Sequence, residues 1–148
     1  MHPHRFRAAL AVALTLACGI ASAATTCQPT VREAWIRLGP AGMDMLAGYA
    51  RIDNACPAEV DIVSASSPGF ADASLHETRI DHGISRMRAL TVLPVSAHGF
   101  VEFAPGGLHL MLMEPTKPLK AGDYVTIDFT LSDGRRIPGR FELRAAAP

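Results

Sequence analysis

"TIDFTLSDGRRIPGRFEL" (residues 126–143) is the stretch that decides the fold. Its two arms contain Ile, Phe and Thr, which are residue types that favour extended strands. Asp133-Gly134 stands between the arms, and an Asp-Gly pair between two such runs is a strong short-range signal for a β-hairpin. The stretch therefore predicts two antiparallel strands that turn at Asp133 and Gly134.

Turn signals built from Gly, Pro, Asn and Asp recur at short intervals on the N-terminal side of this hairpin. Short runs rich in Val, Ile, Thr, Phe and Tyr lie between them, and no long stretch carries a helical period. The clearest such runs are residues 48–53, 60–65, 99–104, 124–131 and 140–144. Eight or nine short strands with close turns predict one all-β domain, a sandwich or a barrel.

The N-terminal segment has the pattern of a secretory signal peptide. Arg5 and Arg7 precede an apolar run at residues 8–17, and small residues at 21–23 provide a cleavage site. We therefore expect a signal peptide at residues 1–23 and a mature, periplasmic domain at residues 24–148. The alternative is a lipid anchor at Cys18, which we do not expect, because the residue three places before it is Thr15 rather than leucine.

The charge balance argues against nucleic acid as a partner. The full chain has 14 basic and 14 acidic residues, and cleavage would remove two arginines and no acid. No run of Lys and Arg stands out, whereas phosphate neutralisation needs clustered basic side chains. No second long apolar segment follows the signal peptide, so we expect no membrane span in the mature chain.

Two cysteines, Cys27 and Cys56, lie in the expected mature chain. An even number of cysteines in an oxidising compartment favours a disulfide, which here would close about 28 residues and contribute roughly 3–4 kcal/mol. A thiolate metal pair is the alternative. A disulfide would leave any metal site without thiolate ligands.

Three large apolar side chains invite a choice between packing and function. Trp35, the only tryptophan, is predicted to anchor the core, because aromatic side chains dominate core burial. Met43 and Met45 could be soft metal ligands, but the simpler interpretation is loop and core packing, since methionine fills irregular gaps.

"LHLMLMEP" (residues 108–115) predicts a strand with two unlike faces. Successive side chains of a strand point to opposite faces, so the leucines share one face and His109, Met111 and Met113 share the other.

"SLHETRIDHGISRMRAL" (residues 74–90) reads as a second hairpin. A turn centred between Asp81 and His82 would place His76 directly opposite Met87, where Cβ atoms are about 5 Å apart. A bulge at Gly83 would shift the register by one residue. The two segments thus offer two His–Met pairs, each formed by local strand geometry.

The donor chemistry of these pairs favours Cu(I). Thioethers are soft ligands that select Cu(I), whereas calcium and magnesium take oxygen ligands and zinc prefers Cys, His and carboxylates. Packing or surface exposure is the ordinary alternative for a single His or Met, but two matching pairs favour a site.

The four residues are spaced as His-x10-Met-x21-His-x-Met, which resembles the motif of the periplasmic copper chaperone family PCuAC. Further segments are similar to that family: "AWIR" (34–37), "AGY" (47–49), "SASSP" (64–68), "LHET" (75–78), "SRMR" (85–88), "FAPGGLHLMLM" (103–113) and "PLKAGD" (118–123). The resemblance covers nearly the whole mature chain.

The resemblance implies a cupredoxin-like, immunoglobulin-like β-sandwich that is not an enzyme. It implies Cu(I) bound by His76, Met87, His109 and Met111, and delivery to the copper centre of cytochrome c oxidase subunit II, directly or through its assembly factors. We expect a monomer. Copper storage for tolerance is the first alternative, and a copper-dependent oxidoreductase is a more remote one.

Three more side chains lie near these segments. Met113 shares the face of His109 and Met111, and we expect it to pack beside the ligands rather than to bind. His82 at the hairpin tip and His98 in a turn are expected to face solvent.

Overall fold

The computed structural model describes residues 27–40 and 42–145, and the predicted signal peptide lies outside them. The described part of the chain forms ten strands and no helix. Membrane-spanning helices are accordingly absent from these described residues. The strands are β1 (Thr30–Leu38), β2 (Met45–Asn54), β3 (Val60–Ser66), β4 (Phe70–Asp81), β5 (Ile84–Ala89), β6 (Leu93–Val95), β7 (Gly99–Phe103), β8 (Leu108–Pro115), β9 (Tyr124–Leu131) and β10 (Arg136–Ala145).

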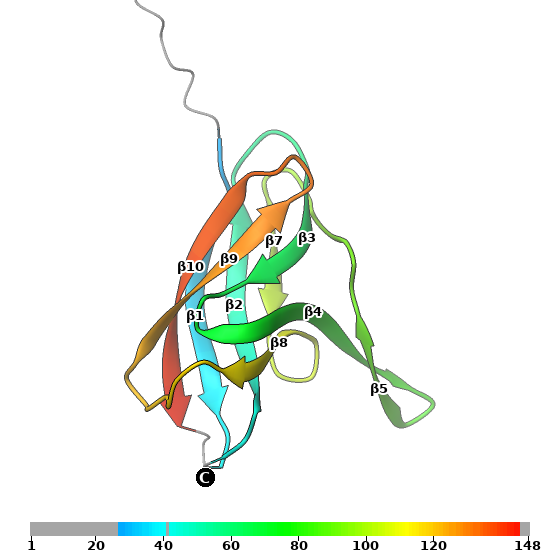
Figure 1. Cartoon of the computed structure of the whole chain (residues 1–148). Helices are drawn as coiled ribbons and strands as arrows, with labels where there is room; N and C mark the ends of the chain where they lie inside the picture. Colours follow the sequence, from blue (N-terminus) through cyan, green and yellow to red (C-terminus); the bar gives the residue numbers. More distant parts are fainter. Residues whose placement is uncertain (1–26, 41, 146–148) are drawn as a thin grey trace, which may run out of the picture.

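The predicted C-terminal hairpin is confirmed as β9 and β10 (Figure 1). Leu131 and Arg135 close it through the bond that the Leu131 N–H donates to the Arg135 carbonyl, at 2.8 Å. The loop between them ends at Gly134, whose φ of 86° is the left-handed conformation that glycine adopts without strain. A three-residue hairpin loop typically places glycine at this position.

The hydrogen-bonded strands follow the order β5-β4-β8-β7-β2-β1-β10-β9-β3-β6, with a further pairing of β8 with β2. This long sheet folds over on itself. Phe103 of β7 and Phe129 of β9 lie four strands apart in the order, yet their ring centroids are 5.9 Å apart. The two halves therefore face each other as a β-sandwich, which confirms the predicted fold class.

One apolar core fills the space between the two halves. Along strands such as β8 and β9, buried core side chains alternate with side chains that face outward, as expected for a sheet with one buried face. Ile127, Phe129 and Phe141 are completely buried, and so are Leu110 and Leu112 of β8. Each such side chain contributes about 1.5–3 kcal/mol of burial free energy.

Trp35 does not belong to this core, so the prediction of a core anchor was wrong. Its neighbour Ile36 points inward and is fully buried, and alternation along β1 therefore turns Trp35 to the outer face. There its ring lies 4.6 Å from that of Tyr49, and the guanidinium groups of Arg37 and Arg144 lie 5.8 and 5.6 Å from its centroid. Trp35 thus packs within an aromatic and cationic cluster on the surface.

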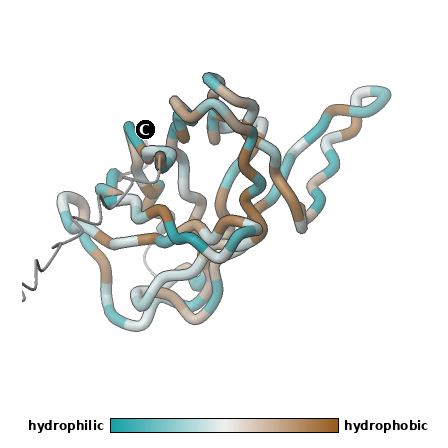
Figure 2. The backbone as a smooth tube through the Cα atoms, turned by 90° about the horizontal axis from the view of Figure 1, so that it is seen from above, coloured by the Kyte–Doolittle hydropathy of each residue, from teal (hydrophilic) through white to brown (hydrophobic). Residues whose placement is uncertain are grey.

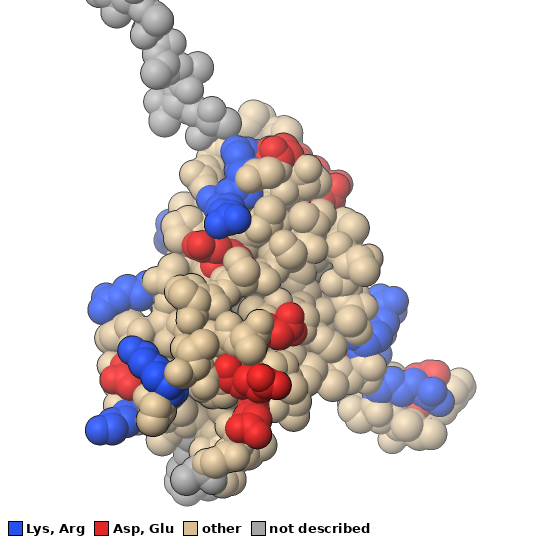
Figure 3. All heavy atoms as spheres, in the orientation of Figure 1, with Lys and Arg blue, Asp and Glu red and all other residues tan. Residues whose placement is uncertain are grey.

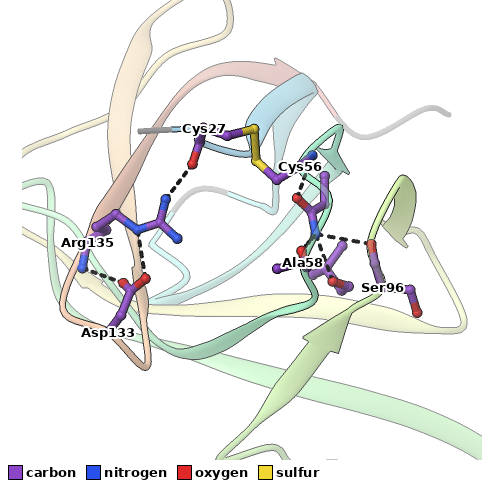
Figure 4. The surroundings of a disulfide bond; sticks show 8 residues. Cys27, Cys56, Ala58, Ser96, Asp133 and Arg135 are labelled. Atoms are coloured by element: carbon purple, nitrogen blue, oxygen red, sulfur yellow. Dashed lines mark hydrogen bonds and ion pairs between the residues drawn. A yellow bond between two sulfur atoms is a disulfide. The ribbon is translucent and has the colours of Figure 1, made fainter. Parts of the chain in front are cut away.

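The predicted disulfide joins Cys27 to Cys56, with Cα atoms 5.6 Å apart (Figure 4). Asn54 organises the turn beside it. Its buried amide donates to the carbonyls of Ala58 and Val95, and its oxygen accepts the Cys56 N–H. Asn54 ends β2 whereas Met45 begins it, so the length of a ten-residue strand, roughly 30 Å, separates the disulfide from the Met45 end.

The β4–β5 hairpin projects from the sandwich, both in Figure 1 and in the view from above (Figure 2). It carries both basic and acidic side chains, and on the face drawn in Figure 3 the basic residues do not gather into one patch. This mixed surface agrees with the balanced charge of the sequence.

Candidate metal centre

β8 presents the two unlike faces that its sequence predicts. Leu110 and Leu112 are fully buried in the core, so the intervening residues point to the outer face of the sheet. His109 is nevertheless 9% exposed, and Met111 and Met113 are half-buried. The outer face of β8 is therefore a sheltered surface of one imidazole and two thioethers.

β4 lies beside β8 and brings the second imidazole to the same face. His76 stands directly opposite His109, and Ser74 stands opposite Met111. The two imidazole rings are 5.9 Å apart between centroids. The structure thus pairs the two predicted histidines with each other.

The position of Met87 differs from the sequence prediction. Thr78, not His76, is the residue opposite Met87, because the hairpin turns at His82-Gly83. Both turn residues have positive φ, 50° and 80°, as in a two-residue type I′ turn. The strand is therefore shifted by two residues, which keeps Met87 on the face of His76 since side chains alternate with a period of two.

Met87 reaches across the hairpin strand to His109. Its Sδ lies 3.2 Å from His109 Nε2. β4 lies between the two residues, and its Thr78, the partner of Met87, donates its N–H to the Gly107 carbonyl just before β8, at 3.0 Å.

The Gly107 carbonyl also fixes the protonation of His109. It lies 3.0 Å from Nδ1, and a carbonyl can only accept, so Nδ1 carries the hydrogen in the neutral ring. Nε2 then offers its lone pair towards the lone pairs of Met87 Sδ. In tetrahedral zinc sites, the nitrogen and sulfur atoms that share one ion lie about 3.5 Å apart. The 3.2 Å between Nε2 and Sδ is close to that separation, so these two donors are placed to share one ion.

His76 has one ring nitrogen without a protein partner. Its Nε2 lies 3.2 Å from Ser74 Oγ, whereas Nδ1 is buried and makes no hydrogen bond. Burial and the neighbouring His109 lower the pKa of His76, although the carboxylate of Asp72 opposes them. The neutral imidazole is thus favoured, and neutral imidazole is the form that binds metals.

β5, the strand that carries Met87, is also linked to β4 by charged side chains. These lie on the face of the hairpin opposite Met87. Arg88 donates two hydrogen bonds to the carboxylate of Glu77, at 3.0 and 3.1 Å. Hydrogen bonds from Arg79 and then Arg88 hold the pKa of Glu77 below its usual range. This ionised network lies on the face opposite Met87 and supports the pairing of β5 with β4.

A surface cavity of about 240 Å³ opens at Met87, His109 and Met111, but His76 does not line it. Met43 and Met45 line the same cavity. They are 44% and 43% exposed, so the interpretation of these two residues as core packing was wrong. The sequence signal that could have indicated a role for Met43 and Met45 is their Met-x-Met spacing at the start of β2, the strand that pairs with β8.

His82 and His98 face solvent as expected. His82 is almost fully exposed at the hairpin tip, where its Nε2 is 3.4 Å from Asp81, and His98 is exposed in its turn. Met113 lies opposite Met45 and Asp72, outside the lining of the cavity.

The donor set defines the kind of site. Nowhere in residues 27–40 and 42–145 do three or more His, Cys, Asp or Glu side chains meet as a metal-binding group. The donors that lie beside His109 are instead thioethers, which are soft and uncharged ligands. The chain is a β-sandwich whose outer surface brings His109 next to the thioether of Met87, with His76 opposite His109.

The family model described as "Putative lipoprotein LpqE-like" matches residues 29–142, so the chain belongs to the LpqE-like family. The predicted membership of the copper chaperone family PCuAC is confirmed, because the structural neighbours are PCuAC domains and LpqE-like is the same family.

Two curated relatives share about a third of their aligned residues with the chain. "Putative lipoprotein Lxx21020" from Leifsonia xyli subsp. xyli is 32% identical over 109 residues, 73% of this chain and 64% of the relative. "Uncharacterized protein RP573" from Rickettsia prowazekii is 31% identical over 88 residues, 59% of this chain and 49% of the relative. The chain thus spans about half to two thirds of the length of these relatives.

Solved structures share the fold. The copper-bound PCuAC domain from PmoF2 superposes with a TM-score of 0.66 at 15% identity, over 80% of this chain and 93% of that domain. The Cu(I) form of DR1885 from Deinococcus radiodurans has a TM-score of 0.63 at 25% identity, over 82% and 83% of the two chains. Its apo form gives the same TM-score and identity over 98% and 97%.

Proposed function

We propose that the chain is a periplasmic copper chaperone that binds one Cu(I) through His76, Met87, His109 and Met111. The observation that carries the proposal is the approach of Met87 Sδ to within 3.2 Å of the His109 Nε2 lone pair. Copper-bound PmoF2 and Cu(I)-bound DR1885, which share this fold, support the choice of metal.

Each donor in the proposed set is neutral. Two imidazoles and two thioethers leave Cu(I) with a net charge of +1, and no cysteine takes part because Cys27 and Cys56 form the disulfide. Such a site keeps its ligands in an oxidising compartment, where free thiols are lost. The set also disfavours zinc, calcium and magnesium, which prefer thiolate or oxygen ligands.

The arrangement suits transfer rather than catalysis. Met87 is 54% exposed on the projecting hairpin, whereas His109 is buried on the body of the sandwich. An acceptor can displace the exposed thioether first, and no proton is needed as it leaves. We propose that the acceptor is the copper centre of cytochrome c oxidase subunit II, or a factor that assembles it, and that the chain acts as a monomer without enzymatic activity.

Anaerobic Cu(I) titration against a chromogenic chelator tests the site. The Met87→Ala/Met111→Ala variant should lose more than about a hundredfold in affinity, since it removes two direct ligands. Met113→Ala is the matched control, because Met113 lies on the same strand face outside the cavity. Unchanged affinity in the double variant would contradict the proposal.

Delivery and storage differ in their consequences for the cell. Deletion of the gene should lower oxidase activity when copper is scarce. A deletion strain that is sensitive to excess copper but has normal oxidase activity would favour storage instead.

A further inference from the structure

We propose that Met43 and Met45 form a second soft-metal site, which captures Cu(I) at the rim of the cavity and passes it to Met111 and His109. The inference rests on the proposed function and extends it. It assigns a role to two residues outside the four-residue ligand motif.

The first observation is the composition of the cavity wall. Four of the six methionines in the chain, Met43, Met45, Met87 and Met111, line one space together with His109. No carboxylate lines it. Four thioethers in one cavity are a soft-donor surface that binds Cu(I) and leaves hard cations in water.

The second observation is that burial does not account for Met43 and Met45. Each leaves more than two fifths of its surface exposed, although both are large apolar side chains. Met45 begins β2, opposite Met113, and Met43 precedes it in the loop. Exposure gives an incoming ion direct access to these sulfurs.

The third observation concerns how Met43 is positioned. Its sulfur rests against Gly39, where an added Cβ would lie only 2.5 Å from Sδ. Met43 and Gly39 also line a neighbouring cavity of about 550 Å³ that reaches the β8–β9 loop. The Met43 side chain thus lines both this cavity and the one that contains His109.

The charge of the cavity wall selects for a monovalent ion. Arg37 is its charged member, and its guanidinium lies 5.3 Å from the ring centroid of Tyr49. A fixed positive charge repels a divalent ion about twice as strongly as a monovalent one at the same distance. Soft ligands beside a cation therefore favour Cu(I) over Cu(II) or Zn(II).

The cavity is large enough for a relay. Its volume of about 240 Å³ is many times the roughly 15 Å³ that a cavity needs to hold one water. Transfer from the capture pair to the His109 site exchanges one set of neutral ligands for another. The copper keeps its oxidation state, and no bond within the protein changes.

Methionine methyl NMR on the full mature protein tests the proposal directly. With methyl-13C methionine and Ag(I), a redox-stable soft monovalent probe, we expect the Met43 and Met45 resonances to shift together with those of Met87 and Met111. The Met43→Leu/Met45→Leu variant, which lacks the two capture resonances, serves as the control, because Met113 is the strand partner of Met45. Shifts of Met87 and Met111 alone would overturn the capture site and leave the proposed function intact.

The opposite result separates the two claims. Shifts confined to Met43 and Met45 would contradict the proposed His76, Met87, His109 and Met111 site, and with it the relay. A lack of shift in all four resonances would overturn both.

Kinetics provide the second readout. Met43→Leu/Met45→Leu keeps the apolar volume and removes both sulfurs, so folding should be preserved. Loading from a Cu(I)–chelator complex should slow by about tenfold, within the range that on-rates vary among related variants, while the final affinity is unchanged. Met113→Leu should load at the normal rate. Normal loading of the double variant would contradict the relay.

Discussion

Met87 Sδ and His109 Nε2 lie 3.2 Å apart although 22 positions separate the two residues in the chain. One residue stands on a projecting hairpin and the other on the body of the sandwich. Because the Gly107 carbonyl holds the hydrogen of His109 on Nδ1, the contact joins two lone-pair donors. The predictions below follow from this relationship and from the strands that create it.

Cu(I) affinity should fall as the pH decreases. Protons compete for His76 and His109 but not for the thioethers. Burial, then His109, lowers the pKa of His76 below its usual 6.5, so His76 stays neutral and able to bind until the pH drops beneath that value. Chelator competition at a series of pH values measures the profile.

Two variants refine this test. Asp72→Asn removes the carboxylate that raises the pKa of His76, so the loss of affinity should move to lower pH. Met87→Ala should weaken binding at every pH yet leave the shape of the profile unchanged. An affinity that does not depend on pH would argue against imidazole ligands.

The hairpin turn should respond to its two residues in opposite directions. Gly83→Ala forces a side chain into a φ of 80° and should lower the free energy of unfolding by about 1 kcal/mol. His82→Asn should raise it by a few tenths, because asparagine tolerates the left-handed conformation and Asn-Gly favours a type I′ turn. Chemical denaturation measures both.

The matched control for the turn is Ser85→Ala, an exposed β5 residue, which should change stability by less than about 0.5 kcal/mol. Equal effects of Gly83→Ala and Ser85→Ala would contradict the assigned turn.

The Cys27–Cys56 disulfide should support stability without affecting the metal site. Replacement of both cysteines by serine removes a crosslink across 28 intervening residues and should cost roughly 3–4 kcal/mol. Cu(I) affinity at a pH and temperature where the variant remains folded should match the wild type, because the disulfide lies at the far end of β2 from Met45. A matching loss of affinity would show that the two ends are coupled.

Export can be checked by the mass of the mature protein. We predict cleavage after Ala23, so the purified chain should begin at Ala24 and carry no lipid. The family description includes the word lipoprotein, and Cys18 is the residue that a lipid would modify. A mature chain that begins with a lipidated Cys18 would contradict the predicted signal peptidase site.

The sequence predicted the strands well where local chemistry determines them. Alternation of leucine with His109 and Met111 correctly indicated the two faces of β8, and Asp133-Gly134 correctly located the last hairpin. The register of the β4–β5 hairpin was wrong by two residues because His82-Gly83 adopts a turn that a histidine rarely enters.

Long-range features were harder to predict. The pairing of β4 with β8 sets His76 against His109, and no local pattern in either strand contains this information. Trp35 was placed inside because hydrophobicity alone does not reveal which face of a strand meets the core. Met43 and Met45 were assigned to packing for the same reason.

X-ray absorption on the anaerobic Cu(I) complex at one equivalent tests the central claim most directly. We predict a mixed first shell of nitrogen and sulfur, and loss of the sulfur scattering in a Met43→Leu/Met45→Leu/Met87→Ala/Met111→Ala variant, which lacks the capture pair as well as the two thioether ligands. A shell of nitrogen and oxygen alone, or sulfur scattering that survives in this variant, would contradict a site built on His109 and Met87.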